Sequence, residues 1–470
     1  MGTINSAFSL ISQALDADQS GLSIVANNVA NANTTGYTRE TPNWQENQPV
    51  DINGVSYGAG VTETGPTSVR DRVLDERLVQ QQQLASASGT RLTALNTLQA
   101  LFTPDSGSST SSAGDIGSDI TTFFDSFSSL EANPSNDALR QQVLSSASIL
   151  AGDVSNAAAS LNSQKAALDQ EASGVTSQVN ALTGALAQLN QQIQSISPDA
   201  DAGTLEDQRQ QDLSQLSQLI GINQVTTENN GISITTTSGQ LLVSEGSSVP
   251  LTTGSVGGVT HFFVGNTDVT AQLTNGGGEL GGYLTARDQD IPTALASLDQ
   301  LAYSVSTQVN KLNNAGTDLD GDNGNAGNLF SQPAQVAGSA ASMSVVMTNP
   351  NHIAAAGAGQ GTGDNSNATA MASLANQGIV SGQTPTDFYS NFVTTLGSTV
   401  SNVQTENTAQ NASVTQLQTQ NDALSGVNLD DEASSMTTLE RSYQAASQVF
   451  TMLNTIIASA LNLGEETTVS

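Results

Sequence analysis

The sequence predicts a mainly α-helical, elongated, multidomain protein with β insertions, in which the terminal helices form a coiled coil. Three observations carry this prediction. Apolar repeats of seven residues occur at both ends of the chain, a long repeat in the middle predicts an antiparallel helical bundle, and one segment alternates as a small inserted β domain. With 470 residues, the chain is long enough for several domains.

Residues 1–36 carry apolar side chains in alternating steps of four and three, which is typical of a narrow coiled-coil seam. Gly36 stands where the helix is expected to end. The seam consists of Ile4, Phe8, Ile11, Leu15, Asp18, Leu22, Val25 and Val29, with Asp18 as its one polar position. A cluster of asparagines near its end needs an explanation, because each costs roughly 0.7 kcal/mol against alanine inside a helix. The cluster consists of Asn27, Asn28, Asn31 and Asn33.

The next segments alternate between extended and helical patterns. Residues 40–68 contain three prolines and a Gly-rich turn and are predicted to be extended, whereas residues 70–102 predict a helix and 103–118 a loop. A seven-residue register then runs over 143–196, long enough for a helix of about 80 Å. After the break "SPDADAG", a second helix follows to residue 221, so the pair predicts a helical hairpin.

Residues 222–278 change to Thr-, Val- and Gly-rich alternation, which predicts a small β insertion. Helical spacing returns from Leu295 to Leu312, a mixed stretch covers 330–380, and a last long helix of the body is expected from Phe388 to Leu424.

The chain ends as it begins, with an amphipathic helix. Asn428 is placed to cap its start, and the acidic residues that follow complement the helix dipole. Its apolar stripe consists of Leu429, Ala433, Met436, Leu439, Tyr443, Ala446, Phe450, Leu453, Ile457 and Ala460. Because both terminal stripes are narrow, we expect the two helices to pack on each other.

This pattern predicts a nested domain organisation. The outermost unit is a terminal coiled coil made of residues 1–36 and 425–470. Inside it lies a helical-bundle domain of residues 37–221 and 279–424 with short β elements, and the 222–278 β domain is inserted in that bundle.

Composition excludes several classes of function. The formal net charge is −32 with eleven basic residues, so neither a nucleic-acid surface nor an anionic membrane surface is expected. The chain has no cysteine, which excludes disulfides and thiolate chemistry. No apolar run is long enough for a membrane span, and the start lacks the pattern of a cleaved signal peptide.

Motifs for catalysis or cofactor binding are weak. "GVSYG" at 54–58 fits a nucleophile elbow but is flanked by Pro and Gly, and the possible bases, His261 and His352, have no supporting pattern. "DLDGDNG" at 318–324 has the spacing of a calcium loop without its required glycine and glutamate, so an Asx-turn loop is favoured over weak cation binding. We therefore predict no catalytic residue, no cofactor and no dedicated metal site.

Two stretches resemble a known family. "ANNVANANTTGYTRE" (26–40) resembles the N-terminal signature of the bacterial flagellar rod, hook and hook-associated axial proteins, and "SGVNLDDEASSMTTLERSYQAASQVF" (425–450) resembles their C-terminal helix. "LEDQRQQDLSQLSQLIGI" (205–222), the stretch 277–324 and "GDNSNATAMASLANQ" (363–377) are similar to the hook-associated protein 1 branch. These matches cover both ends and most of the helical middle.

The resemblance implies a structural, non-enzymatic protein that polymerises at the distal end of the hook and forms the junction between hook and filament. Implied partners are copies of itself in a ring-like layer, the hook protein, hook-associated protein 3 or the filament, an export chaperone and the flagellar type III export apparatus. It implies an extracellular place in the flagellum, reached without a cleaved signal peptide.

The resemblance also assigns assembly roles to residues of both terminal helices. On the first helix, Asn27 and Asn31 share a face and Val25 and Val29 a neighbouring one, so we expect the valines to pack on the C-terminal helix and the neutral amides to bind another subunit. The N-terminal assembly set is Ile4, Phe8, Ile11, Leu15, Leu22, Val25, Asn27, Asn28, Val29, Asn31, Asn33, Gly36 and Tyr37. The C-terminal set, for assembly and chaperone binding, is Leu429, Met436, Leu439, Tyr443, Phe450, Leu453 and Ile457.

Two alternatives stay open from the sequence. A flagellar hook or rod subunit would share the terminal signatures but not the long central hairpin. An exported flagellum-associated hydrolase would require an acid–base pair that no motif supplies. For the asparagines, the alternative to a subunit contact is a frayed polar helix end.

Overall fold

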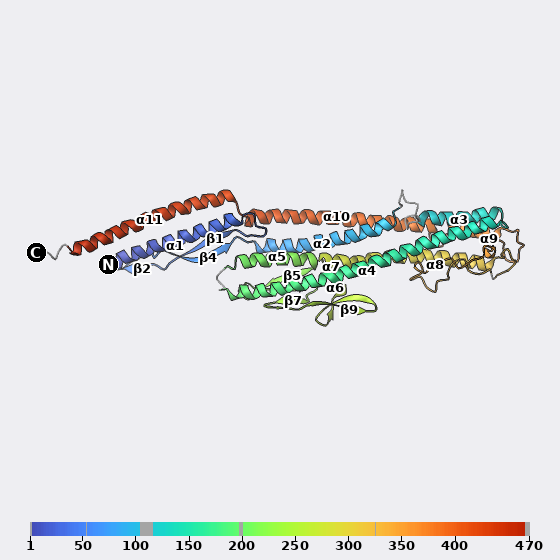
Figure 1. The fold of residues 1–470 in the computed structure, drawn as a ribbon, viewed down its shortest axis with the longest axis horizontal. Helices are drawn as coiled ribbons and strands as arrows, with labels where there is room; N and C mark the ends of the chain where they lie inside the picture. Colours follow the sequence, from blue (N-terminus) through green and yellow to red (C-terminus); the bar gives the residue numbers. More distant parts are fainter. Residues whose placement is uncertain (1, 53, 104–115, 197–200, 325, 466–470) are drawn as a thin grey trace.

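The computed structural model describes residues 2–52, 54–103, 116–196, 201–324 and 326–465. The molecule is long and thin, its helices follow the long axis, and the first and last helices lie together at one end (Figure 1). The predicted mainly helical, elongated architecture with β insertions is confirmed. No helix among the described residues is both long and apolar enough to cross a membrane.

The terminal helices α1 (Gly2–Asn31) and α11 (Leu429–Glu465) lie side by side, as their seams predict (Figure 1). Asn428 caps α11, because its side chain accepts the N–H of Asp430 at 3.0 Å. α1 ends five residues before Gly36, which adopts a positive φ of 78°.

The predicted extended segment forms two antiparallel hairpins beside α1. The pairs are β1 (Glu40–Glu46) with β4 (Val61–Ser68), and β2 (Val50–Ile52) with β3 (Val55–Tyr57). All three residues of β3 are exposed, including the serine of "GVSYG". A nucleophile elbow requires a turn from a buried strand into a helix, so this hairpin does not provide one.

The body is a bundle of long helices. α10 packs along α2, and α4 packs along α3 and α5, so the predicted α4–α5 hairpin is confirmed. α4 has 59 residues, about 90 Å of helix at roughly 1.5 Å per residue. The main helices are α2 (Arg72–Leu101), α3 (Ile116–Ala132), α4 (Asp137–Ser195), α5 (Thr204–Leu219), α7 (Gly278–Thr285), α8 (Ile291–Ala315), α9 (Ser366–Ser373) and α10 (Pro385–Ser425).

The structure corrects two of the sequence predictions. Helix α3 was not predicted, and it includes the end of the expected 103–118 loop; residues 104–115 of that loop lie outside the described residues. The helix expected from Leu295 begins earlier, because α7 continues through the π-helix η3 (Ala286–Asp290) into α8.

The β insertion consists of two small antiparallel sheets beside α4. One has the strand order β5–β6–β7–β8 and the other β11–β10–β9. Short helical turns, η2 (Glu228–Asn230) and α6 (Thr270–Leu273), complete it. The strands are β5 (Ile222–Thr226), β6 (Ile232–Thr236), β7 (Leu241–Ser244), β8 (Ser247–Ser248), β9 (Leu251–Val256), β10 (Val259–Val264) and β11 (Thr267–Asp268).

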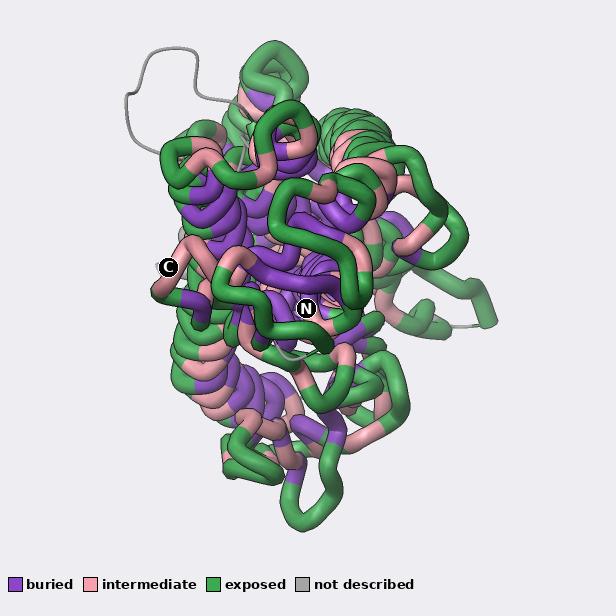
Figure 2. Tube along the Cα trace, turned by 90° about the vertical axis from the view of Figure 1, so that its right-hand side faces the viewer, coloured by how far each residue is buried: buried purple, intermediate pink, exposed green. Residues whose placement is uncertain are grey.

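Two hydrophobic cores hold the body together. The first surrounds the phenylalanines of α3, where Phe123 packs edge-on against Phe127 and Phe330 at centroid distances of 5.3 and 5.4 Å. Each fully buried Phe contributes about 1.5–3 kcal/mol relative to exposure. The second core joins α4 and α5 to the β insertion. Figure 2 shows the buried residues gathered between the helices, with exposed residues on the outer faces.

Candidate functional site

The paired terminal helices α1 and α11 form the first candidate site. The rings of Phe8 and Phe450 contact each other at an interplanar angle of 40°, with their centroids 4.6 Å apart. Gly21 is buried, and a methyl group in its place would lie 3.1 Å from Leu439. Glycine at this position therefore lets α1 approach α11 closely.

The structure places the predicted C-terminal residues on two sides of α11. Tyr443 and Leu429 are 38% and 52% exposed, so they do not face α1 as the stripe requires. The others are partly buried: Met436, Leu439, Phe450, Leu453 and Ile457.

On α1, the seam drifts away from its predicted path near the end of the helix. Ile11 and Val25 are buried, and Phe8, Leu15 and Leu22 are partly buried. The side chain of Ile4 lies outside the described residues.

Val29 is 39% exposed, and Asn28 takes the buried position that the seam assigned to it. A straight helix with 3.6 residues per turn drifts against a 3.5-residue repeat, which accounts for the change.

Asn28 is a clamp within the chain. Its Nδ2 donates to the carbonyl of Glu40 at 2.8 Å and to Glu432 Oε2 at 3.1 Å. Its Oδ1 accepts the N–H of Glu40 at 3.0 Å and the hydroxyl of Tyr37 at 2.8 Å. The side chain is 1% exposed and satisfies every bond it can make. Asn28 therefore fixes α1, the start of β1 and α11 to one another, and does not belong to the outer amide face.

The other asparagines lie on the outside. Asn31 Nδ2 donates to both the carbonyl and Oδ1 of Asn27, at 3.0 and 2.9 Å. Asn27 and Asn33 are exposed. Gly36 lies against Gln211 of α5, whose Nε2 donates to the carbonyl of Thr35 at 2.7 Å. The end of the signature thus contacts the body, while its outer amides remain accessible.

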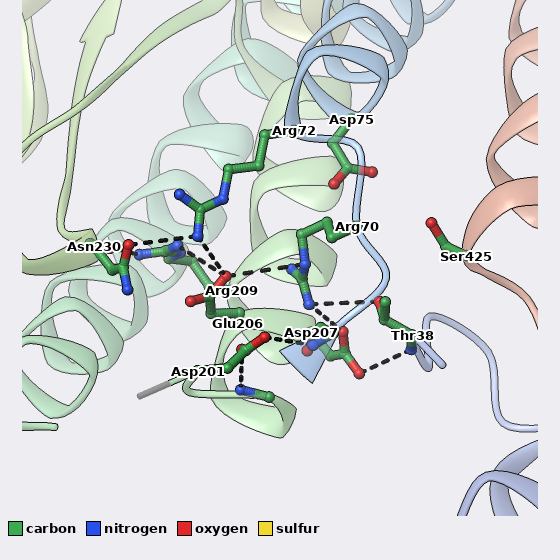
Figure 3. A network of polar contacts seen from close by, with 12 residues as sticks. Thr38, Arg70, Arg72, Asp75, Asp201, Glu206, Asp207, Arg209, Asn230 and Ser425 are labelled. Carbon is green, nitrogen blue, oxygen red and sulfur yellow. Dashed lines mark hydrogen bonds and ion pairs between the residues drawn. The ribbon is translucent and has the colours of Figure 1, made fainter. Parts of the chain in front are cut away.

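The second candidate site joins this signature loop to the body, and Figure 3 shows it in close view. Arg70 Nη2 lies 2.5 Å from Asp207 Oδ1, and Asp207 Oδ2 accepts the N–H of Thr38 at 3.0 Å. Glu206 Oε2 lies 3.9 Å from Arg70 Nε and 3.8 Å from Arg209 Nη2. We call these residues, with Arg72, the joint.

Neighbouring contacts complete the attachment. Asp201 accepts the backbone N–H groups of Ser68 at 2.5 Å and Gly203 at 2.9 Å. The N–H of Arg39 donates to the carbonyl of Ser425, the last residue of α10, at 2.8 Å. The joint therefore brings together the signature loop, the end of β4, the start of α5 and the end of α10.

Burial shifts several pKa values at this place. Burial, reinforced by nearby carboxylates, raises the pKa of Tyr37 to about 12. Burial also raises the pKa of Glu40 and lowers that of Arg209 to about 10. For Asp201, burial opposes ionisation, but hydrogen bonds from Ser68 and Gly203 outweigh it and lower the pKa. These groups attach the signature loop to the body. They do not form a solvent-accessible pair of a general acid and a general base.

The sequence analysis missed the joint. The sequence did contain a signal for it, because the chain has only eleven Lys and Arg residues. Two of them, Arg70 and Arg72, lie close together, and a third, Arg209, lies close to the acidic pair of "LEDQR" in α5. Fully buried charges are paired with few exceptions, so such arginines and acids predict an ion-pair network. Which acid pairs with which arginine depends on the tertiary fold.

Asp75, at the contact between α2 and α10, gives a pH prediction. It is buried, and its Oδ1 accepts Asn421 Nδ2 at 3.0 Å. Burial raises its pKa, against the opposing effects of Arg70 and Asn421. Because the folded state then binds the proton more tightly than the unfolded state, ionisation of Asp75 costs stability as pH rises through its folded pKa.

We therefore expect Asp75→Asn, which keeps the acceptor and removes the charge, to raise Tm at pH 7. The gain should shrink as pH falls toward about 4, the ordinary aspartate pKa. Thermal unfolding of both proteins across this range measures it. A lower Tm for the variant at pH 7 would contradict the prediction.

Three family models match the chain in order. The flagellar hook-associated protein FlgK helical domain matches residues 105–330. The flagella basal body rod protein model matches 12–38, and the flagellar basal body rod FlgEFG protein C-terminal model matches 419–463. The two terminal matches fall on α1 with its signature and on α11, and the first match covers the central hairpin and β insertion.

Relatives and a solved structure give the same result along the chain. Flagellar hook-associated protein 1 of Salmonella typhimurium is 25% identical over 550 residues, covering 96% of this chain and 98% of that protein. The protein of that name from Bacillus subtilis is 26% identical over 504 residues, covering 96% of each. The flagellar hook junction protein FlgK of Burkholderia pseudomallei shares the fold, with a TM-score of 0.66 and 19% identity over 74% of this chain and all of that one.

The paired terminal helices, the signature loop and the helical body thus occur in the order in which the family models match them, and the relatives align over nearly the whole length. Along nearly its whole length the chain is therefore similar to flagellar hook-associated protein 1, and its central part matches the helical domain of that family.

Proposed function

We propose that this chain is a structural protein of the bacterial flagellum that polymerises at the distal end of the hook and forms the junction to the filament. The observation that carries the proposal is the α1–α11 pair, held at one end of a long body with neutral amides on its outer face. Neutral amides can repeat around a closed layer of subunits without charge repulsion. The similarity to flagellar hook-associated protein 1 supports the same role.

The partners follow from surfaces that the single chain leaves open. Val449, Met452 and Ile456 are 43%, 57% and 54% exposed on α11, at spacings that share one helix face. Phe450 and Leu453, one position further, are partly buried. We propose that the exposed face contacts a neighbouring copy in a ring-like layer, and that an export chaperone covers it before assembly.

Further partners are the hook protein on one side and hook-associated protein 3 or the filament on the other. We propose export through the flagellar type III apparatus without a cleaved signal peptide, to an extracellular position in the flagellum. No catalytic role is proposed, because the terminal and joint side chains serve packing and attachment.

Deleting the protein tests this role in cells. We expect electron microscopy to show hooks without filaments and an immunoassay to find unpolymerised flagellin in the medium, because filament growth would lack its base. Expression of the intact chain should restore filaments. Absent hooks would assign the chain to the hook or rod instead, and normal flagella would refute a junction role.

A further inference from the structure

Two loops lie against each other at the end of the body opposite the terminal helices (Figure 1). One is "DLDGDNG", after α8, and the other is the turn η4 (Pro350–His352). The N–H of Leu319 donates to the carbonyl of Asn351 at 3.0 Å. The buried guanidinium of Arg140 donates to the carbonyls of Asn351 at 3.2 Å and Ile353 at 2.6 Å. Arg140 of α4 therefore fixes the backbone of the turn.

Three metal-ligating side chains meet where these loops touch. Asp318, Asp320 and His352 each offer one ligand atom, and these atoms lie within 4.8 Å of one another. His352 Nε2 is 3.6 Å from Asp320 Oδ2. Asp320 Oδ1 accepts Asn351 Nδ2 at 3.1 Å, which orients its carboxylate. His352, unlike the aspartates, is distant in sequence, so the loop motif alone did not reveal this set.

Asp318 supplies an independent reason to expect a ligand. It is 1% exposed. Its Oδ1 accepts the N–H of Asp322 at 2.8 Å, but its buried Oδ2 has no hydrogen-bond partner in the part of the chain that the structure describes. A buried carboxylate oxygen without a partner is unfavourable, and a cation is the partner that two carboxylates and an imidazole suit best.

We propose that Asp318, Asp320 and His352 bind a divalent transition-metal cation such as Zn²⁺, with water completing its coordination. A nitrogen ligand beside two carboxylate oxygens favours Zn²⁺ over Ca²⁺ and Mg²⁺, which take oxygen ligands. Bound there, the cation ties the loop after α8 to η4 and stiffens this end of the body. The proposal is independent of the junction role.

Calorimetric titration of the full chain with ZnCl₂ tests the site, using protein without a histidine tag, stripped by chelator and kept in excess Mg²⁺. We expect one Zn²⁺ per chain. His352→Gln should weaken binding by more than about tenfold. The chain's other histidine provides the matched control, because His261→Gln removes an imidazole elsewhere and should leave the affinity unchanged.

Thermal unfolding provides a second readout. Zn²⁺ should raise the Tm of the unaltered chain and of His261→Gln, but not that of His352→Gln, because a ligand stabilises only the state that binds it. Absence of saturable binding, equal affinity in the two histidine variants, or full displacement by Mg²⁺ would overturn the proposal.

Discussion

Asn28→Ala is expected to loosen the whole terminal pair. The substitution leaves the N–H and carbonyl of Glu40 without their partner and removes the amide that faces Glu432. Leaving such groups unpaired in a buried position should cost about 2–3 kcal/mol. Hydrogen–deuterium exchange should therefore become roughly 30- to 150-fold faster in α1 and α11, with the body unchanged.

Asn31→Ala is the matched control, on the same helix and one turn from Asn27. Its amide donates only within α1, and alanine favours a helix, so exchange in the isolated chain should stay slow. If the outer amides bind another subunit, Asn31→Ala should still reduce filament number in cells. Equal exchange in both variants would contradict the clamp, and normal filaments with Asn31→Ala would contradict the outer amide face.

The behaviour of Asn28 is repeated elsewhere in the chain. On α4, Asn180 exchanges two hydrogen bonds with the backbone of Leu251, and Asn190 does so with Ile232. On α8, Asn310 does the same with Phe330. In each case the side-chain amide of a helix residue bonds both the N–H and the carbonyl of one strand or loop residue, as a neighbouring β-strand would. In a chain with few charged residues, asparagine side chains thus make several of the long-range attachments, beside the ion pairs of the joint.

This pattern explains how far the sequence could predict the structure. The seven-residue repeats predicted α1, α4 and α11. The sequence also shows that asparagine inside a helix carries a free-energy cost relative to alanine. The partner of each amide lies elsewhere in the chain, on backbone that carries no side-chain signal. Sequence alone therefore indicated that Asn28 needs a partner but could not distinguish Glu40 from another subunit.

Helix α3 was missed for a different reason. Ile116, Ile120, Phe123, Phe127 and Leu130 do follow helical spacing, and all are buried. The helix follows a Ser- and Gly-rich stretch, and the predicted loop was extended to residue 118, beyond the first residue of the helix. For the joint, the sequence could predict only that the arginines need acidic partners. Arg70 and Asp207 meet because α5 packs on α2, which the sequence does not show.

Arg70→Met is expected to detach the terminal layer, which comprises α1, α11 and the paired strands β1 and β4, from the helical body. It leaves the carboxylates of Asp207 and Glu206, whose side chains are 10% and 3% exposed, with less positive charge nearby. Removing one partner of a buried ion pair typically costs 3–5 kcal/mol, so we expect a loss of about that size. The chain's single tryptophan, Trp44 on β1, reports on the terminal layer alone.

In urea, the Trp44 fluorescence transition of Arg70→Met should move down by roughly 1–3 M, while the far-UV circular dichroism transition of the helical body moves much less. Arg72→Met is the control, because Arg72 is 54% exposed and lies 3.4 Å from the same Glu206; its loss should cost less than about 1 kcal/mol. Equal shifts in both variants, or both signals moving together, would mean that the ion pairs do not act as a local attachment. If the fluorescence transition shifts without the circular dichroism transition, Arg70 fixes the orientation of the α1–α11 pair relative to the body. Cells that carry Arg70→Met should then form few filaments, although the exposed faces of α1 and α11 are unchanged.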